Sequence, residues 1–169
     1  MKNRGFTILE TLIVCAIIGF IAAIAIPMYM NAQNRAKQSR TIGNIRTIAS
    51  AWESRGAEVK AYNAAGANFA IPTVNVTAAQ MTTMLTPTYL REIPAKDGWG
   101  WPFDFKLNSA IGSGTTAITY SIRSPGRDGV LEAAGKTNYR IQATTSFDCD
   151  IVYSNGTFIA YPQGKQNAK

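Results

Sequence analysis

The sequence predicts an α+β fold in which one very long N-terminal helix packs on a small antiparallel sheet of three or four strands. Two observations predict the helix. Residues 11–30 carry no formal charge, and a segment of that length can span a bilayer. Apolar and small residues then recur in alternating steps of three and four, at Ile42, Ile45, Ala49, Trp52, Gly56 and Val59. A helix over residues 6–62 would be about 80 Å long, whereas globular helices average about 11–12 residues.

The apolar N-terminal segment, residues 11–30, has three interpretations: a cleaved secretory signal, a lipoprotein signal, or a retained transmembrane helix whose leader is removed before the apolar part. Ala23-Ile24-Ala25 supports the first and Leu12-Ile13-Val14-Cys15 the second. Glu10 argues against both, because a carboxylate near the centre of a membrane helix costs about 2.5–3.5 kcal/mol and a disposable signal gains nothing from it.

The third interpretation rests on a motif. Gly5-Phe6-Thr7-Ile8-Leu9-Glu10 resembles the class III signal of type IV prepilins and type II secretion pseudopilins, with Ile8-Leu9 in place of the more usual leucine-isoleucine. The resemblance implies that a prepilin peptidase removes the leader, residues 1–5, by cutting between Gly5 and Phe6, and methylates the new amine of Phe6. It also implies a single pass through the bacterial inner membrane with the N-terminus cytoplasmic, and a periplasmic or extracellular filament after assembly.

Glu10 is expected to act in assembly. Cleavage would create a positive amine on Phe6 at about the membrane depth of the Glu10 carboxylate, and buried charges are tolerated when they are paired. The carboxylate of one subunit would therefore pair with the Phe6 amine of its neighbour. The alternative is a carboxylate that snorkels to the interface or stays protonated.

The distribution of basic residues leaves the orientation open. Two cations precede the span and four follow it, which conflicts with the positive-inside rule for a cytoplasmic N-terminus. The preceding cations are Lys2 and Arg4, and the following ones are Arg35, Lys37, Arg40 and Arg46. The resemblance to prepilins decides for the cytoplasmic N-terminus.

Two residues weaken the first half of the helix. Gly19 costs about 1 kcal/mol relative to alanine, and Pro27 removes a backbone hydrogen bond at a cost of about 3 kcal/mol. In pilins a glycine and a proline at matching places border a stretch that loses its helical structure in the filament, and the resemblance implies the same for residues 19–27. A kinked transmembrane helix is the alternative.

The chain therefore divides into a leader (1–5), a membrane and assembly half of the helix (6–30), an amphipathic half (31–62) and a globular domain (63–169). Within the last, residues 63–76 are expected to form a loop, and Asn75 or Thr77 to cap a short helix limited by Pro87. Alternation predicts strands at 103–107, 118–123 and 150–161, the last split by a turn at 154–157. Residues 162–169 are expected to be loose.

A calcium site is expected in two loops of the globular domain. Residues 87–103 resemble a segment of the major pseudopilin of type II secretion, and Ser124-Pro125-Gly126-Arg127-Asp128-Gly129 resembles that protein's calcium loop. The resemblance assigns calcium to Asp128 with Asp148 or Asp150, and hard cations do prefer such oxygen ligands. Residues 137–144 and the positive Arg127 depart from the family pattern. The alternative is that these aspartates cap turns through Asx hydrogen bonds.

Function follows from these features and from an absence in the composition. The chain has no histidine, the commonest general base and metal ligand, so an enzyme is not expected. We expect a structural subunit that polymerises into a helical homo-oligomeric filament, a type IV pilus or a type II secretion pseudopilus, with prepilin peptidase and the inner-membrane assembly platform as partners.

A DNA-uptake pilin is an alternative, because loss of Lys2 and Arg4 lowers the net charge only from +7 to +5, although a solvated basic surface is preferred to nucleic-acid binding. A single-span periplasmic protein without an assembly role is another.

Overall fold

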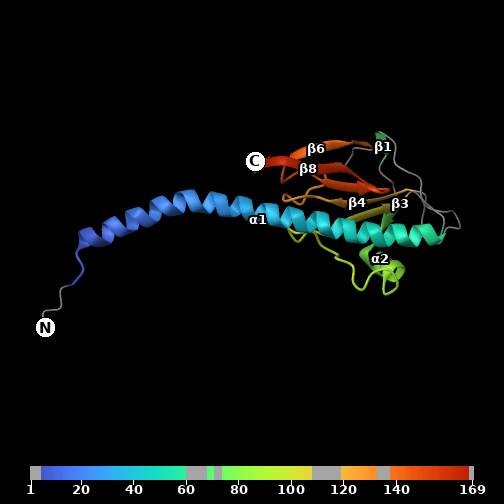
Figure 1. Ribbon diagram of the computed structural model, residues 1–169, viewed down its shortest axis with the longest axis horizontal. Helices are drawn as coiled ribbons and strands as arrows, with labels where there is room; N and C mark the ends of the chain where they lie inside the picture. The colour runs from blue at the N-terminus through green and yellow to red at the C-terminus, as the bar shows by residue number, and fades with distance from the viewer. Residues whose placement is uncertain (1–4, 60–67, 71–73, 108–118, 133–137, 168–169) are drawn as a thin grey trace. The chain divides into compact units, whose positions relative to one another are not determined.

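The computed structural model describes residues 5–59, 68–70, 74–107, 119–132 and 138–167. These residues belong to two compact units, Met1–Asn34 and Arg35–Lys169. The first unit contains only the N-terminal part of helix α1. The second contains the rest of α1 together with the strands and the helix α2 (Figure 1).

Helix α1 runs from Ile8 to Val59 and has 52 residues, which confirms the expected single long helix. Pro27 lies inside it and does not end it. The helix begins two residues later than expected, and its expected end at residue 62 lies outside the described residues. Loss of helical structure over residues 19–27 is expected only in an assembled filament, so it stays a prediction.

The main sheet has six strands in the order β2-β3-β4-β7-β8-β6, more than the three or four expected. Every neighbouring pair is antiparallel except β6 and β8, which are parallel. A separate antiparallel pair joins β1 to β5. The strands are β1 (Asn68–Ala70), β2 (Val74–Val76), β3 (Asp104–Leu107), β4 (Tyr120–Ser124), β5 (Asn138–Arg140), β6 (Gln142–Ser146), β7 (Ile151–Ser154) and β8 (Thr157–Asn167).

Two expectations about irregular segments were wrong. The tail expected to be loose is ordered as far as Asn167, because β6 pairs with β8 and the buried Gln166 donates from Nε2 to the carbonyl of Thr144 at 2.9 Å. The loop expected over residues 63–76 contains β2, which pairs with β3. The edge strand β2 has only three residues, and the edge strand β6 is polar. Their sequences therefore lack the apolar alternation that marks a half-buried strand.

Helix α2 (Ala78–Leu85) confirms the expected capping by Thr77. The Thr77 hydroxyl accepts from the backbone N–H of Gln80, and the Gln80 side chain accepts from the backbone N–H of Thr77. This reciprocal pair satisfies two backbone donors at the helix start. The helix buries Met81 and Leu85.

The core lies where the apolar stripe of α1 meets the sheet. Ile45, Ala49 and Trp52 are buried, as the stripe predicted, and the Trp52 ring lies 4.6 Å from the ring of Tyr120 in β4, measured between centroids. Phe105 of β3 packs in the same cluster as the buried residues of α2. Figure 1 shows strands on one side of this half of α1 and α2 on the other. One helix thus supplies a central element of the globular core.

Candidate functional site

The N-terminal motif lies at the start of α1, where Thr7 and Glu10 bond each other. The backbone N–H and the hydroxyl of Thr7 both donate to Glu10 Oε2 at 2.9 Å, and the Glu10 backbone N–H donates to Thr7 Oγ1 at 3.2 Å. This is a capping box, with Thr7 as N-cap and Glu10 three residues into the helix. Sequence reasoning missed it, although Thr-x-x-Glu before an apolar run is its usual signal.

The capping box gives Glu10 a role within its own chain, besides the role expected between subunits. Its Oε2 is the acceptor of both Thr7 donors, whereas Oε1 accepts from no described residue. Phe6, which would carry the new amine, is 85% exposed and precedes the helix. A carboxylate held by Thr7 can therefore still present one oxygen to another subunit. That pairing stays a prediction.

The predicted cleavage point lies in a non-helical segment. Residues 5–7 precede α1, and no heavy atom would come within 4 Å of a Cβ placed on Gly5. A peptidase needs an accessible chain, and this segment is exposed and lies outside the helix. Cleavage after Gly5 and methylation of Phe6 remain predictions.

The apolar side chains of the first half of α1 are exposed. The exposed fraction is 64% for Leu12, 61% for Ile18, 71% for Phe20 and 68% for Met28, and the other large apolar residues of this stretch are similar. The helix is long and apolar enough to cross a membrane. A continuous apolar surface of this extent needs lipid or other protein chains as its surroundings. Cys15 lies on this surface, and no disulfide joins it to Cys149.

In the globular unit, the two loops that carry the expected calcium ligands lie together. The backbone N–H of Arg127 donates to the carbonyl of Phe147 at 2.8 Å. Gly126 has φ +74°, and a Cβ there would lie 2.7 Å from the carbonyl oxygen of Cys149, so the approach of the two loops requires glycine. The structure therefore brings the loops of Asp128 and Asp148 side by side, as the resemblance implied.

The positive group between these loops is the side chain of Arg127. Its Nε donates to Asp148 Oδ1 at 2.7 Å and its Nη2 to Asp148 Oδ2 at 2.9 Å, a two-point pair that engages both carboxylate oxygens. Asp128 accepts from the backbone N–H of Val130, and Asp150 from that of Glu132. Among the described residues no three His, Cys, Asp or Glu side chains are grouped to hold a metal ion. Calcium binding stays a prediction.

Asp97 organises the segment that resembles the major pseudopilin. This buried carboxylate accepts at Oδ1 from the backbone N–H groups of Trp99 and Trp101, both at 2.9 Å. Its Oδ2 accepts from the hydroxyl of Ser124 at 2.7 Å. The loop then contacts α1, because the Gly98 N–H donates to Thr41 Oγ1 at 2.9 Å. Asp97 therefore links the loop to β4 while the loop itself rests on the helix.

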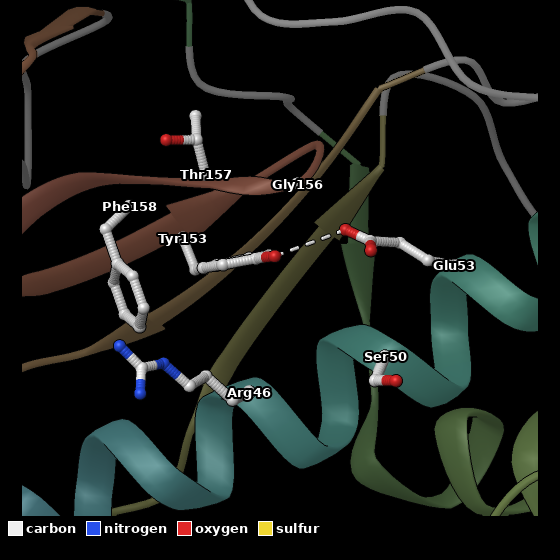
Figure 2. A pocket seen from close by; sticks show the side chains of 7 residues that line it. All are labelled: Arg46, Ser50, Glu53, Tyr153, Gly156, Thr157 and Phe158. Carbon is white, nitrogen blue, oxygen red and sulfur yellow. Dashed lines mark hydrogen bonds between the residues drawn. The ribbon is translucent and has the colours of Figure 1, made fainter.

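A second polar cluster lies between α1 and the β7–β8 hairpin (Figure 2). Glu53 Oε1 accepts from the hydroxyls of Tyr120 and Tyr153, the latter at 3.4 Å. Burial, followed by the hydrogen bond to Glu53, raises the pKa of Tyr120 well above its usual value. The pKa of Tyr153 is raised by burial and by the nearby Glu53 charge. Arg46 lies 5.5 Å from the centre of the Phe158 ring, a cation–π contact. This cluster stabilises the packing of the hairpin on the helix.

Comparisons with known proteins give one match to a family model and several matches to individual proteins. Residues 1–26 match the family described as the prokaryotic N-terminal methylation motif. The chain is 45% identical over 62 residues to the type IV major pilin protein PilA of Myxococcus xanthus, which covers 37% of this chain and 28% of PilA. It is 29% identical over 138 residues to the type II secretion system core protein G of Pseudomonas aeruginosa, which covers 76% of this chain and 88% of that protein.

These matches support the type IV pilin and pseudopilin family. A further relative is the type IV major fimbrial protein FimA of Dichelobacter nodosus, 50% identical over 48 residues, or 27% of this chain and 31% of FimA. The chain thus spans less than a third of PilA and of FimA, but most of core protein G. No solved structure matches it. The α+β fold of the structure is as the sequence indicated. The motif at residues 5–10 lies within the segment that matches the methylation family.

Proposed function

We propose that this chain is a structural subunit that polymerises, after removal of residues 1–5 by prepilin peptidase, into a type IV pilus-like filament or a type II secretion pseudopilus. The observation that carries the proposal is the exposed apolar half of α1 directly behind the methylation motif. Lipid would cover this surface before assembly, and the same half of neighbouring subunits would cover it in the filament. Its role is to pack, so no active site is proposed.

The comparisons support both kinds of filament. The matches to pilins cover about a third of the chain, whereas the match to a type II secretion core protein covers 76% of it and so includes much of the globular part. None of the relatives reported above is named for DNA uptake. We place the unassembled subunit in the bacterial inner membrane with its N-terminus cytoplasmic and its globular unit outside, where the assembly platform collects it.

Assembly is proposed to depend on the charge of Glu10 and not on its capping bonds. The Phe6 amine of one subunit would approach Glu10 Oε1 of the next, while Oε2 keeps its bonds to Thr7. An ion pair away from water is retained when both members are matched, and removal of one member leaves an uncompensated charge.

Two substitutions separate these roles. Glu10→Gln keeps a capping side chain, since glutamine also serves in capping boxes, but removes the charge. Thr7→Ala removes the cap and keeps the charge. We expect Glu10→Gln to abolish fibres in the sheared surface fraction and Thr7→Ala to retain them, as seen by electron microscopy, with mass spectrometry reporting methylated Phe6. Normal fibres from Glu10→Gln would refute the ion pair, and absence of this chain from any fibre or envelope-confined pseudopilus would refute the proposed function.

A further inference from the structure

The basic residues that follow the apolar span form an exposed cluster on α1. Arg35, Lys37 and Arg40 are all exposed, and they lie within ten residues of the end of the apolar stretch at residue 30. A helix rises 1.5 Å per residue, so these three cations lie within about 15 Å of that end along the helix. The headgroup layer of one leaflet is about 5–7.5 Å thick. Arg35, about 7.5 Å past that end, therefore lies at its outer edge, and the long side chains of Lys37 and Arg40 would reach back toward it.

The globular fold adds two further cations at this part of α1. The buried Gln38 donates from Nε2 to Gln166 Oε1 at 3.4 Å, which brings the exposed Lys165 of β8 to this region of the helix. Asn44 donates from Nδ2 to the carbonyl of Lys96 at 3.3 Å, and the Lys96 side chain is exposed. We name the cluster of five cations the basic collar: Arg35, Lys37, Arg40, Lys96 and Lys165.

Acidic side chains are sparse around the helical part of the basic collar. The sequence has no Asp or Glu between Glu10 and Glu53, and Asp97, next to Lys96, is buried with its oxygens turned to Trp99, Trp101 and Ser124. In the part of the chain that the structure describes, none of the five cations forms an ion pair. Exposed like charges repel one another, so a cluster of this kind costs stability unless anions lie nearby.

We propose that the basic collar binds the phosphate groups of anionic phospholipids in the leaflet from which the globular unit emerges. This gives a role to three of the four cations that follow the span, against the positive-inside rule. Arginine and lysine bind phosphate through charge-assisted hydrogen bonds, and each such residue at an anionic membrane surface strengthens binding about fivefold. The contact would hold the unassembled subunit at the membrane and would be broken when the subunit leaves it for a filament.

The test uses the full chain in a neutral detergent and native mass spectrometry. Dioctanoyl phosphatidylglycerol and dioctanoyl phosphatidylcholine are titrated against the native chain, the triple variant Arg35→Gln/Lys37→Gln/Arg40→Gln, and the control Arg55→Gln/Arg91→Gln/Lys106→Gln. The control removes the same charge from positions outside the collar. We expect the native chain and the control to bind phosphatidylglycerol at least about tenfold more tightly than phosphatidylcholine, and the triple variant to lose this preference.

Other outcomes overturn the proposal. Equal affinity for the two lipids, or an equal loss in the control, would mean that the collar has no special role. Displacement of phosphatidylglycerol by an equal concentration of inorganic phosphate would indicate a free-anion site. Tighter binding of a 20-base-pair DNA duplex that depends on the same three residues and falls steeply with salt would indicate a nucleic-acid surface. The inference rests on the membrane-anchored state proposed above but not on assembly, so Glu10→Gln chains that form no filaments should still bind the lipid.

Discussion

Gly98 lies directly against the backbone of Lys37 in α1. A Cβ placed on Gly98 would be 2.0 Å from the Lys37 carbonyl oxygen and 2.8 Å from its Cα. The neighbouring hydrogen bond from the Gly98 N–H to Thr41 Oγ1 fixes the loop at this distance. Thr41 itself is fully buried. The close contact between Gly98 and the Lys37 backbone therefore allows the Asp97 loop to pack on the helix.

Gly98→Ala should therefore destabilise the globular unit strongly. The added methyl group collides with backbone and not with a flexible side chain, and overpacking of this kind costs about 1–3 kcal/mol or more. Gly43→Ala is the matched control, since Gly43 is exposed on the same helix with no atom within 4 Å of its Cβ position. It should stabilise the chain by about 0.5–1 kcal/mol through helix propensity. Urea unfolding followed by tryptophan fluorescence measures both, and equal stabilities would contradict the contact.

Glu53→Ala should cost about 1–3 kcal/mol of unfolding free energy, because the buried Tyr120 hydroxyl loses its carboxylate acceptor. The control is Glu58→Ala. Glu58 also accepts from a tyrosine, Tyr89, but at the surface, where substitutions usually change stability by less than about 0.5 kcal/mol. A similar loss of unfolding free energy in both variants would show that the burial of the Tyr120–Glu53 bond does not increase its contribution to stability.

Stability should also fall at high pH because of Tyr120. Its pKa is raised by burial and then by Glu53, whereas an unfolded tyrosine ionises near pH 10. Above about pH 10 the folded chain therefore binds more protons than the unfolded one. The contribution of protonated Tyr120 to the free energy of unfolding is fully present below that pH. It is lost as the pH rises, by about 1.4 kcal/mol per pH unit. Unfolding free energies between pH 9 and 11.5 should fall less steeply for Tyr120→Phe, and an unchanged slope would contradict this assignment.

The sequence predicted the parts of the fold that depend on local patterns. The length of α1 follows from an uncharged stretch and a helical stripe, and three of the stripe residues, Ile45, Ala49 and Trp52, are buried. The Thr77 cap follows from short-range spacing. These signals involve residues within four positions of one another, where the covalent chain fixes the geometry.

The missed features depend on residues far apart in the chain or on polar patterns. The parallel pairing of β6 with β8 joins Gln142 to Ala160, and polar strands of this kind carry no alternation that a sequence would reveal. The bonds of Glu53 to Tyr120 and Tyr153 connect positions 67 and 100 residues apart. The Thr7–Glu10 capping box is different, because its Thr-x-x-Glu spacing is a local pattern that the sequence alone displays.

Calcium binding by Asp128, Asp148 and Asp150 leads to a prediction about Arg127. Its guanidinium engages both oxygens of Asp148, so it competes with any cation for that carboxylate. A ligand bound only to the folded state raises the melting temperature. We expect calcium, compared with a chelator, to raise the melting temperature of Arg127→Gln by more than that of the native chain, and Asp148→Asn to show no rise.

Arg91→Gln is the control for loss of a positive charge, because Arg91 is exposed in another loop. Its melting temperature should respond to calcium as the native chain does. If millimolar calcium changes the melting temperature of neither the native chain nor Arg127→Gln, these aspartates form no calcium site. In that case Asp128 caps its turn by accepting from the Val130 N–H, and Asp150 links two loops by accepting from the Glu132 N–H.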